Sequence, residues 1–135
     1  MTGLTGIGGN ITTNTTWSGR VYVTSSVYVR DDATLTIEPG TQILVKTGAR
    51  IVVSTNSTGS TLSAVGTEAA PISFCGVTAT PGAWGGILVD GGLAVGSALE
   101  HVLIEDGGGV EAGLVLRAPL RVNDLQVRNS GTDGV

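Results

Sequence analysis

The stretch VYVRDDATLTIEPGTQILVKTGARIVV, residues 27–53, decides the fold of this chain. It contains four apolar triplets that begin eight residues apart, at residues 27, 35, 43 and 51. The segments between the triplets carry the turn formers Asp31-Asp32, Pro39-Gly40 and Gly48. This pattern predicts short strands separated by corners, with the fourth strand arriving where the first began.

Apolar segments in the rest of the chain extend this pattern into three columns of stacked strands. Strands of the first column begin at residues 27, 51, 87, 114 and 135, so successive coils hold 24, 36, 27 and 21 residues. Periods of this length indicate a solenoid, in which stacking of neighbouring coils supplies the core. The expected inward pairs are, in the first column, Val27/Val29, Ile51/Val53, Ile87/Val89 and Leu114/Leu116; in the second, Leu35/Ile37, Leu62/Ala64, Leu93/Val95 and Leu120/Val122; and in the third, Val21/Val23, Ile43/Val45, Ile72/Phe74, Val102/Ile104 and Leu125/Val127.

The corners are too short for helical crossovers, so every strand in a column runs the same way and the sheets are parallel. We therefore expect an all-β chain, a single domain over residues 1–135 with three parallel sheets and about four coils. Residues 1–20 fit the columns poorly and predict an irregular first coil or cap before the regular coils of residues 21–135. The chain ends within a predicted strand at Val135 and without a polar cap, which is typical of a fragment of a longer protein.

Composition excludes several classes of function. A net charge of −4 and a pI near 4.7 argue against a nucleic-acid partner, which needs a basic surface. No apolar run approaches the roughly 18 residues of a membrane helix, so no membrane insertion is expected. The single cysteine, Cys75, excludes an internal disulfide, and the opening MTGLTGIGGN carries no targeting signal.

Several segments together resemble a known fold. They are LTIEPGTQILV (residues 35–45), GARIVV (48–53), GSTLSAVGTEAAPISF (59–74) and AWGGILV (83–89). They resemble the right-handed parallel β-helix of the pectate-lyase-like superfold, and more narrowly the repeats of large secreted or surface-attached bacterial proteins. The resemblance implies a right-handed parallel β-helix and an extracellular or cell-surface location for the parent protein. It leaves function open, because this superfold includes polysaccharide lyases, adhesins and inert stalks.

Residues that could carry chemistry are scattered. No predicted outward column presents two acidic residues in adjacent coils, so the calcium-binding carboxylates that the resemblance would imply are not expected. The best remaining acidic positions are Glu105, Asp106, Glu111, Asp90 and Asp124, and we interpret them as solvated loop carboxylates. The only histidine, His101, lies beside Glu100, but neighbours along a strand face opposite sides. We therefore predict no catalytic residues, no cofactor and no metal.

An apolar outer stripe is the feature that points to a partner. Tyr28, Val52, Leu88 and Val115 are the middle residues of the first-column triplets and are expected to stack on the outside of that sheet. An exposed apolar stripe that runs across four coils usually marks a contact surface. Trp84 and Val135 extend the candidate interaction surface, although the long corner of residues 75–86 could instead fold over the stripe.

The function we expect is therefore structural. The chain is interpreted as a scaffold module that is not an enzyme and that self-associates end to end or side by side. The alternative is a carbohydrate-binding or polysaccharide-degrading β-helix. Ice binding is a remote alternative, because Thr13/Thr15, Thr34/Thr36 and Thr78/Thr80 fall at unrelated corners and columns.

Overall fold

The computed structural model describes residues 6–53, 60–78, 80, 82–89, 98–108, 114–116 and 121–128. These residues form strands and corners, and they contain no helix long and apolar enough to cross a membrane. The strands are β1 (Gly6–Ile11), β2 (Thr15–Trp17), β3 (Arg20–Val29), β4 (Thr34–Ile37), β5 (Gln42–Val45), β6 (Ile51–Val53), β7 (Thr61–Val65), β8 (Ile72–Gly76), β9 (Ile87–Val89), β10 (Ala98–Glu105), β11 (Leu114–Leu116) and β12 (Arg121–Arg128).

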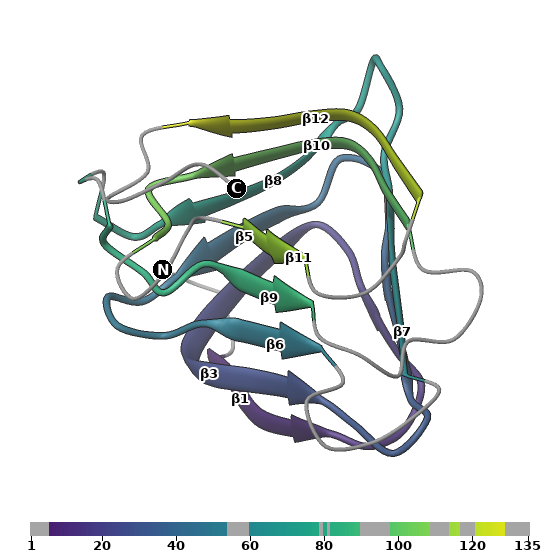
Figure 1. Cartoon of the computed structure of the whole chain (residues 1–135), viewed down its shortest axis with the longest axis vertical. Coiled ribbons are helices and arrows are strands. Elements are labelled where there is room, and N and C mark those ends of the chain that lie inside the picture. The colour runs from purple at the N-terminus through teal and green to yellow at the C-terminus, as the bar shows by residue number, and fades with distance from the viewer. Residues whose placement is uncertain are drawn as a thin grey trace.

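Every strand pair is parallel, and the pairs build the three predicted columns. The first column runs through β1, β3, β6, β9 and β11, which follow one another in Figure 1. The second runs through β2, β4, β7, β10 and β12. The third runs through β1, β3, β5, β8, β10 and β12. The all-β parallel solenoid is therefore confirmed, while the right hand and the count of about four coils stay predictions.

Four strands belong to two columns because they continue through a corner. β1 and β3 pass from the third column to the first, and β10 and β12 pass from the second to the third. These continuous strands join the three predicted sheets into one hydrogen-bonded sheet of twelve strands. The corner within β12 therefore lies in register with the corner within β10.

The core lies inside the columns and consists mainly of aliphatic side chains. Along β4, β5 and β7 buried residues alternate with more exposed ones, as the period of a half-buried strand requires. Each fully buried aliphatic or aromatic side chain contributes on the order of 1.5–3 kcal/mol of transfer free energy. The largest fully buried side chains are Trp84, Phe74, Leu35, Ile37, Ile43, Ile51, Leu62, Ile72, Ile87, Leu99 and Ile104.

The second column differs from the prediction in its later coils. Leu93 and Val95 were expected to stack on Leu62 and Ala64, but Leu99 of β10 is the residue in register with Ala64. Leu93, Val95 and Leu120 lie outside the described residues. The prediction of the stacking was wrong because residues 98–105 contain no turn former, so the corner within β10 could not be recognised.

The register of the third column also shifts once. Ile43 pairs with Phe74 rather than with Ile72, although Ile104 pairs with Phe74 as expected. The shift amounts to two residues, and because side chains alternate with a period of two, it keeps every inward residue inward.

Residues near the N-terminus pair more regularly than their sequence suggests. β1 and β2 extend the columns by pairing with β3 and β4. Their irregularity is a change of register between Ile7 and Gly9, where β1 turns from the third column to the first.

Candidate functional site

The corner that β10 and β12 share brings two strained residues together. His101 and Asp124 have φ values of 50° and 51°. They lie between the paired residues Glu100 and Asn123 on one side and Val102 and Leu125 on the other. A left-handed conformation costs a residue with a side chain about 1–3 kcal/mol, and such residues concentrate at functional sites. The strained backbone therefore makes this corner a candidate site.

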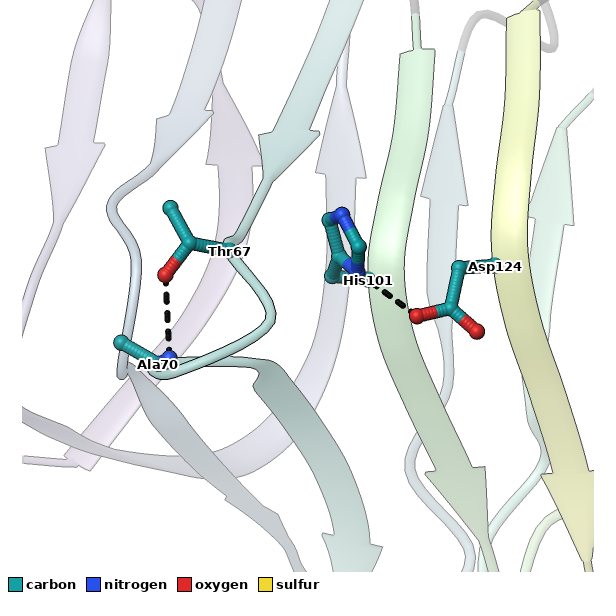
Figure 2. A network of polar contacts seen from close by, with 4 residues as sticks. All are labelled: Thr67, Ala70, His101 and Asp124. Atoms are coloured by element: carbon teal, nitrogen blue, oxygen red, sulfur yellow. Dashed lines mark hydrogen bonds and ion pairs between the residues drawn. The ribbon is translucent and has the colours of Figure 1, made fainter.

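The two side chains are in direct contact. The His101 Nδ1 atom lies 2.6 Å from the Asp124 Oδ2 atom. A dashed line marks this contact in Figure 2. The pair is open to solvent, with the His101 side chain 27% exposed and that of Asp124 54% exposed. A pair as exposed as this contributes under about 1 kcal/mol to stability. The contact matters more for orientation, because a carboxylate on one ring nitrogen fixes the imidazole and leaves the other nitrogen for a ligand.

A hollow of about 230 Å³ opens beside this pair on the outer face of the third column. Its lining is polar and apolar in nearly equal parts. The lining residues are Thr67, Glu68, Pro71, His101, Val102, Leu103, Asp124, Gln126 and Arg128. Pockets for drug-sized ligands are usually larger, at about 300–1,000 Å³, so this hollow suits a single small ring or one unit of a chain.

A tight turn forms the far wall of the hollow. The Thr67 Oγ1 atom accepts a hydrogen bond from the Ala70 backbone N–H at 2.9 Å, which closes the turn opposite His101 in Figure 2. Gly66 leads into this turn and donates its backbone N–H to the Glu100 carbonyl at 2.8 Å. The turn is thus bonded to the strand that carries His101, which holds the two walls together.

The charges around the hollow are mixed. Glu68 and Asp124 supply carboxylates, and Arg128 supplies a guanidinium that donates to the Gln126 side-chain oxygen at 3.1 Å. The hollow therefore offers hydrogen-bond acceptors and donors close together. Among the described residues, no group of three or more His, Cys, Asp and Glu side chains is placed to hold a metal ion.

A family model described as a pectate-lyase-like β-helix domain matches residues 9–106. This chain belongs to that family. The match covers the β-helix domain through the His101 corner and ends before Asp124. Comparison with curated proteins gave no match, and comparison with solved structures gave none either.

Two of the other predicted acidic positions of this β-helix domain, Glu105 and Asp106, lie within the described residues and next to the core. Glu105 and Asp106 support the core through their backbones: the Glu105 carbonyl accepts the Trp84 Nε1–H at 2.7 Å, and the Asp106 carbonyl accepts the Trp84 backbone N–H at 3.3 Å. Asp106 is itself only 5% exposed, so it is not the solvated carboxylate that was predicted. Asp90 and Glu111 lie outside the described residues.

Cys75 lies near these two carboxylates on the same β-helix domain. Burial raises the pKa of the Cys75 thiol, and the Asp106 and Glu105 carboxylates raise it further. The thiolate is the reactive form of a cysteine. The thiol of Cys75 is therefore protonated at neutral pH and is poorly suited to nucleophilic chemistry.

The predicted apolar stripe exists as a stack, but much of it is covered. Tyr28, Val52, Leu88 and Val115 are in register across four strands of the β-helix domain. Val52 is only 3% exposed and Leu88 only 7%, so the predicted exposure was wrong at both positions. The wholly apolar triplets of β6 and β9 indicated this, because such runs are typical of strands buried on both faces. Tyr28 is partly exposed and carries the Arg30 guanidinium over its ring, 4.9 Å from the ring centroid.

Trp84 was also wrongly placed on the surface. It is 0% exposed, and its ring centroid lies 6.5 Å from that of Phe74 in the core. The long corner reaches into the interior at this point, between glycines 82 and 86, whose positive φ values permit tight turns. The side chain of Val115 and the whole of Val135 lie outside the described residues.

A short row of hydroxyl side chains lies on the second column, where Thr36 stands in register between Thr16 and Ser63. Thr15 is in register with Leu35, so the pairs Thr13/Thr15 and Thr34/Thr36 do not stack on each other, as expected. The row stops at β10, where the residue in register with Ser63 is the buried Ala98. A hydroxyl array confined to three strands gives ice binding no further support.

Proposed function

We propose that this pectate-lyase-like β-helix domain is a structural module whose stack of coils self-associates at the edge of β12. The observation that carries the proposal is the exposure of apolar side chains at that edge. Val122 is 41% exposed, whereas Leu99, the residue in register with it one coil earlier, is 0% exposed. A scaffold role in a secreted or cell-surface bacterial protein belongs to the same proposal.

The backbone of β12 supports the same proposal. β12 pairs with β10 along its length, from Arg121 to Arg128. Among the described residues no strand pairs with its opposite edge, whereas β10 is paired on both sides. An edge with free N–H and C=O groups is a template for another strand. Strand addition there would satisfy these groups and cover Val122, Leu125 and Val127.

Sedimentation velocity over a concentration series tests this proposal. We expect the mean mass to rise with concentration, and we expect Val122→Asp to suppress the rise because a carboxylate would be buried in the contact. Asn123→Asp is the matched control: it adds the same charge at the next residue, whose side chain faces the other way. A monomer at every concentration, or equal effects of the two substitutions, would contradict the proposal.

The His101–Asp124 hollow favours a second candidate function, the binding of a carbohydrate chain. Sugars present several hydroxyl groups around an apolar ring face, and the hollow combines carboxylates, an amide and a guanidinium with Pro71 and Leu103. Its volume fits one sugar unit better than a longer segment. Membership of the pectate-lyase-like family is consistent with such a ligand.

The single histidine provides a direct test of this second function. Its imidazole signals in an NMR spectrum are the only ones of their kind in the chain. Titration with oligogalacturonate, and separately with a neutral oligosaccharide, is expected to shift these signals. Glu68→Gln should weaken the shift caused by the neutral oligosaccharide, because it removes a carboxylate acceptor, whereas Glu38→Gln, a substitution of an exposed residue that does not line the hollow, should leave it unchanged. Signals that stay in place with both saccharides would exclude the hollow as a carbohydrate site.

A further inference from the structure

We infer that the hollow beside His101 selects ligands that donate hydrogen bonds, and that it takes a neutral saccharide in preference to an acidic one. Asp124 is the positioning residue that sets this preference through its contact with His101. The inference rests on the proposed carbohydrate binding at the hollow and adds the chemical class of the ligand. All of the residues involved belong to the described lining of the hollow or to the strands beside it.

The short contact between His101 and Asp124 fixes where the imidazole carries its proton. The Nδ1 and Oδ2 atoms are 2.6 Å apart, so one of them donates a hydrogen bond to the other. An ionised carboxylate only accepts hydrogen bonds, and the donor is therefore the Nδ1–H group. A neutral imidazole carries one proton, which leaves the Nε2 atom of His101 as an acceptor.

This acceptor is available to a ligand. The two nitrogens of an imidazole point in different directions, and in Figure 2 the second ring nitrogen of His101 lies on the far side of the ring from Asp124. Within the part of the chain that the structure describes, the contact with Asp124 is the only hydrogen bond of the His101 ring. The His101 side chain is 27% exposed and lines the hollow, so a ligand there can reach the ring. The ring is held in place before the ligand arrives, which lowers the entropic cost of binding.

The charged groups of the hollow favour the same class of ligand. Glu68, on the turn that forms the far wall, adds a carboxylate that accepts hydrogen bonds. Arg128 supplies a guanidinium, but it donates to the Gln126 side chain at 3.1 Å and lies in register with Glu105 on the neighbouring strand. A carboxylate on a ligand would meet acceptors at His101 and Glu68 and would compete for a guanidinium that is already engaged. Sugar hydroxyl groups, in contrast, can donate to both acceptors.

Protonation of His101 is expected to weaken this preference. An imidazolium carries a proton on both nitrogens, so Nε2 would then donate and attract a carboxylate. Histidine changes its charge between about pH 5 and pH 8, whereas carboxylates and guanidinium groups ordinarily keep theirs over this range. The other charged groups around His101 are Glu68 on the turn, Asp124 and Arg128 on β12, and Glu100 and Glu105 on β10. A change in selectivity over this range therefore reports the imidazole.

NMR of the single histidine tests the position of its proton. Long-range proton–nitrogen correlation spectra at about pH 8 show which ring nitrogen is protonated, and we expect Nδ1. Asp124→Gly removes the carboxylate, and glycine accepts the φ of 51° without strain, so the Nε2–H form should then appear. Asp32→Gly is the matched control, because it removes the same charge at another exposed residue with a positive φ, 62°, that does not line the hollow. A proton on Nε2 in the unsubstituted protein would overturn the inference.

Binding of two matched saccharides tests the selectivity. Trigalacturonate and its fully methyl-esterified form share the same sugar rings and differ in charge. At about pH 8 we expect the ester to bind several-fold more tightly than the acid, and at about pH 5 we expect this ratio to narrow. Asp124→Gly should lower the affinity for the ester several-fold, whereas Asp32→Gly should leave it unchanged. Circular dichroism of each variant confirms that the fold is retained.

The possible failures are distinguishable. Equal binding of the two saccharides at about pH 8, or tighter binding of the acid, would overturn the inference and leave the proposed carbohydrate binding intact. A weaker ester complex in Asp124→Gly without a change in the protonated nitrogen would assign Asp124 a direct ligand contact, and would overturn its positioning role. His101 signals that neither saccharide moves would remove the carbohydrate function of the hollow itself.

Discussion

Replacing Trp84 by alanine is expected to lower the free energy of unfolding by about 3–5 kcal/mol, the range for truncating a fully buried tryptophan. The Trp84 side chain is 0% exposed and packs against Phe74. Its Nε1–H also satisfies the Glu105 carbonyl. Alanine would leave a cavity in the core and remove this hydrogen bond. Urea unfolding followed by far-ultraviolet circular dichroism measures the change.

Two further substitutions separate the contributions of Trp84. Trp84→Phe retains an aromatic ring but lacks the N–H group, so it should cost less than Trp84→Ala. Val77→Ala, at a site that is 49% exposed in the same corner, should change the free energy of unfolding by under about 0.5 kcal/mol. If Trp84→Ala were as mild as Val77→Ala, the corner would not be anchored in the core.

Gly66→Val is expected to destabilise the fold by about 3 kcal/mol or more, near the upper end for overpacking. A Cβ atom at this position would lie 2.9 Å from the His101 carbonyl oxygen, 3.0 Å from the Ile72 nitrogen and 3.1 Å from the Ala70 carbonyl oxygen. All three are backbone atoms, which cannot rotate away as a flexible side chain would. The φ of Gly66 is not positive, so the effect comes from the added side chain and not from the backbone conformation.

The same substitution should be visible at the hollow. Moving the His101 backbone changes the position of the imidazole against Asp124, so the His101 NMR signals should shift along with the loss of stability. Thr67→Ala is the control in the same turn: it removes the hydrogen bond to the Ala70 N–H and should cost about 1 kcal/mol. Unfolding curves for Gly66→Val that overlay those of the unsubstituted protein would show that the turn can move away from β10.

The three columns of strands could be predicted because residues close together in the sequence mark both the strands and the corners. In residues 27–53 each strand is followed within a few residues by glycine, proline or paired aspartates, so alternation and corners could be read together. The strand pairs of β3 with β6 and of β4 with β7 follow directly from that pattern. The inward residues of these strands are buried as expected.

The candidate site was not predictable by the same means. His101 and Asp124 adopt a left-handed conformation without a glycine, so nothing in the sequence marks the corner that brings them together. Glu100, the nearest carboxylate in sequence, was the residue considered as a partner, but the contacting carboxylate comes from the next coil, 23 residues away. A contact across coils depends on the register, and the register here depends on that unmarked corner.

Exposure was the second quantity that the sequence left undetermined. Val52 and Leu88 occupy the outward positions of their strands, as alternation requires, and are nevertheless buried. Alternation separates the two faces of a strand but does not say whether the outer face is covered. Trp84 shows the reverse case, in which a corner residue supplies the core with one of its tryptophan side chains.

The pairing of each strand with only the coil before and the coil after has a consequence for how this protein loses structure. In such arrays, stability is approximately the sum of local terms, and the ends open before the middle. Amide hydrogens of β5 and β8, which are covered on both sides, should therefore exchange with solvent more slowly than those of β12. Unfolding is therefore expected to begin at β12 and to proceed one coil at a time. A second copy bound to β12 would slow it.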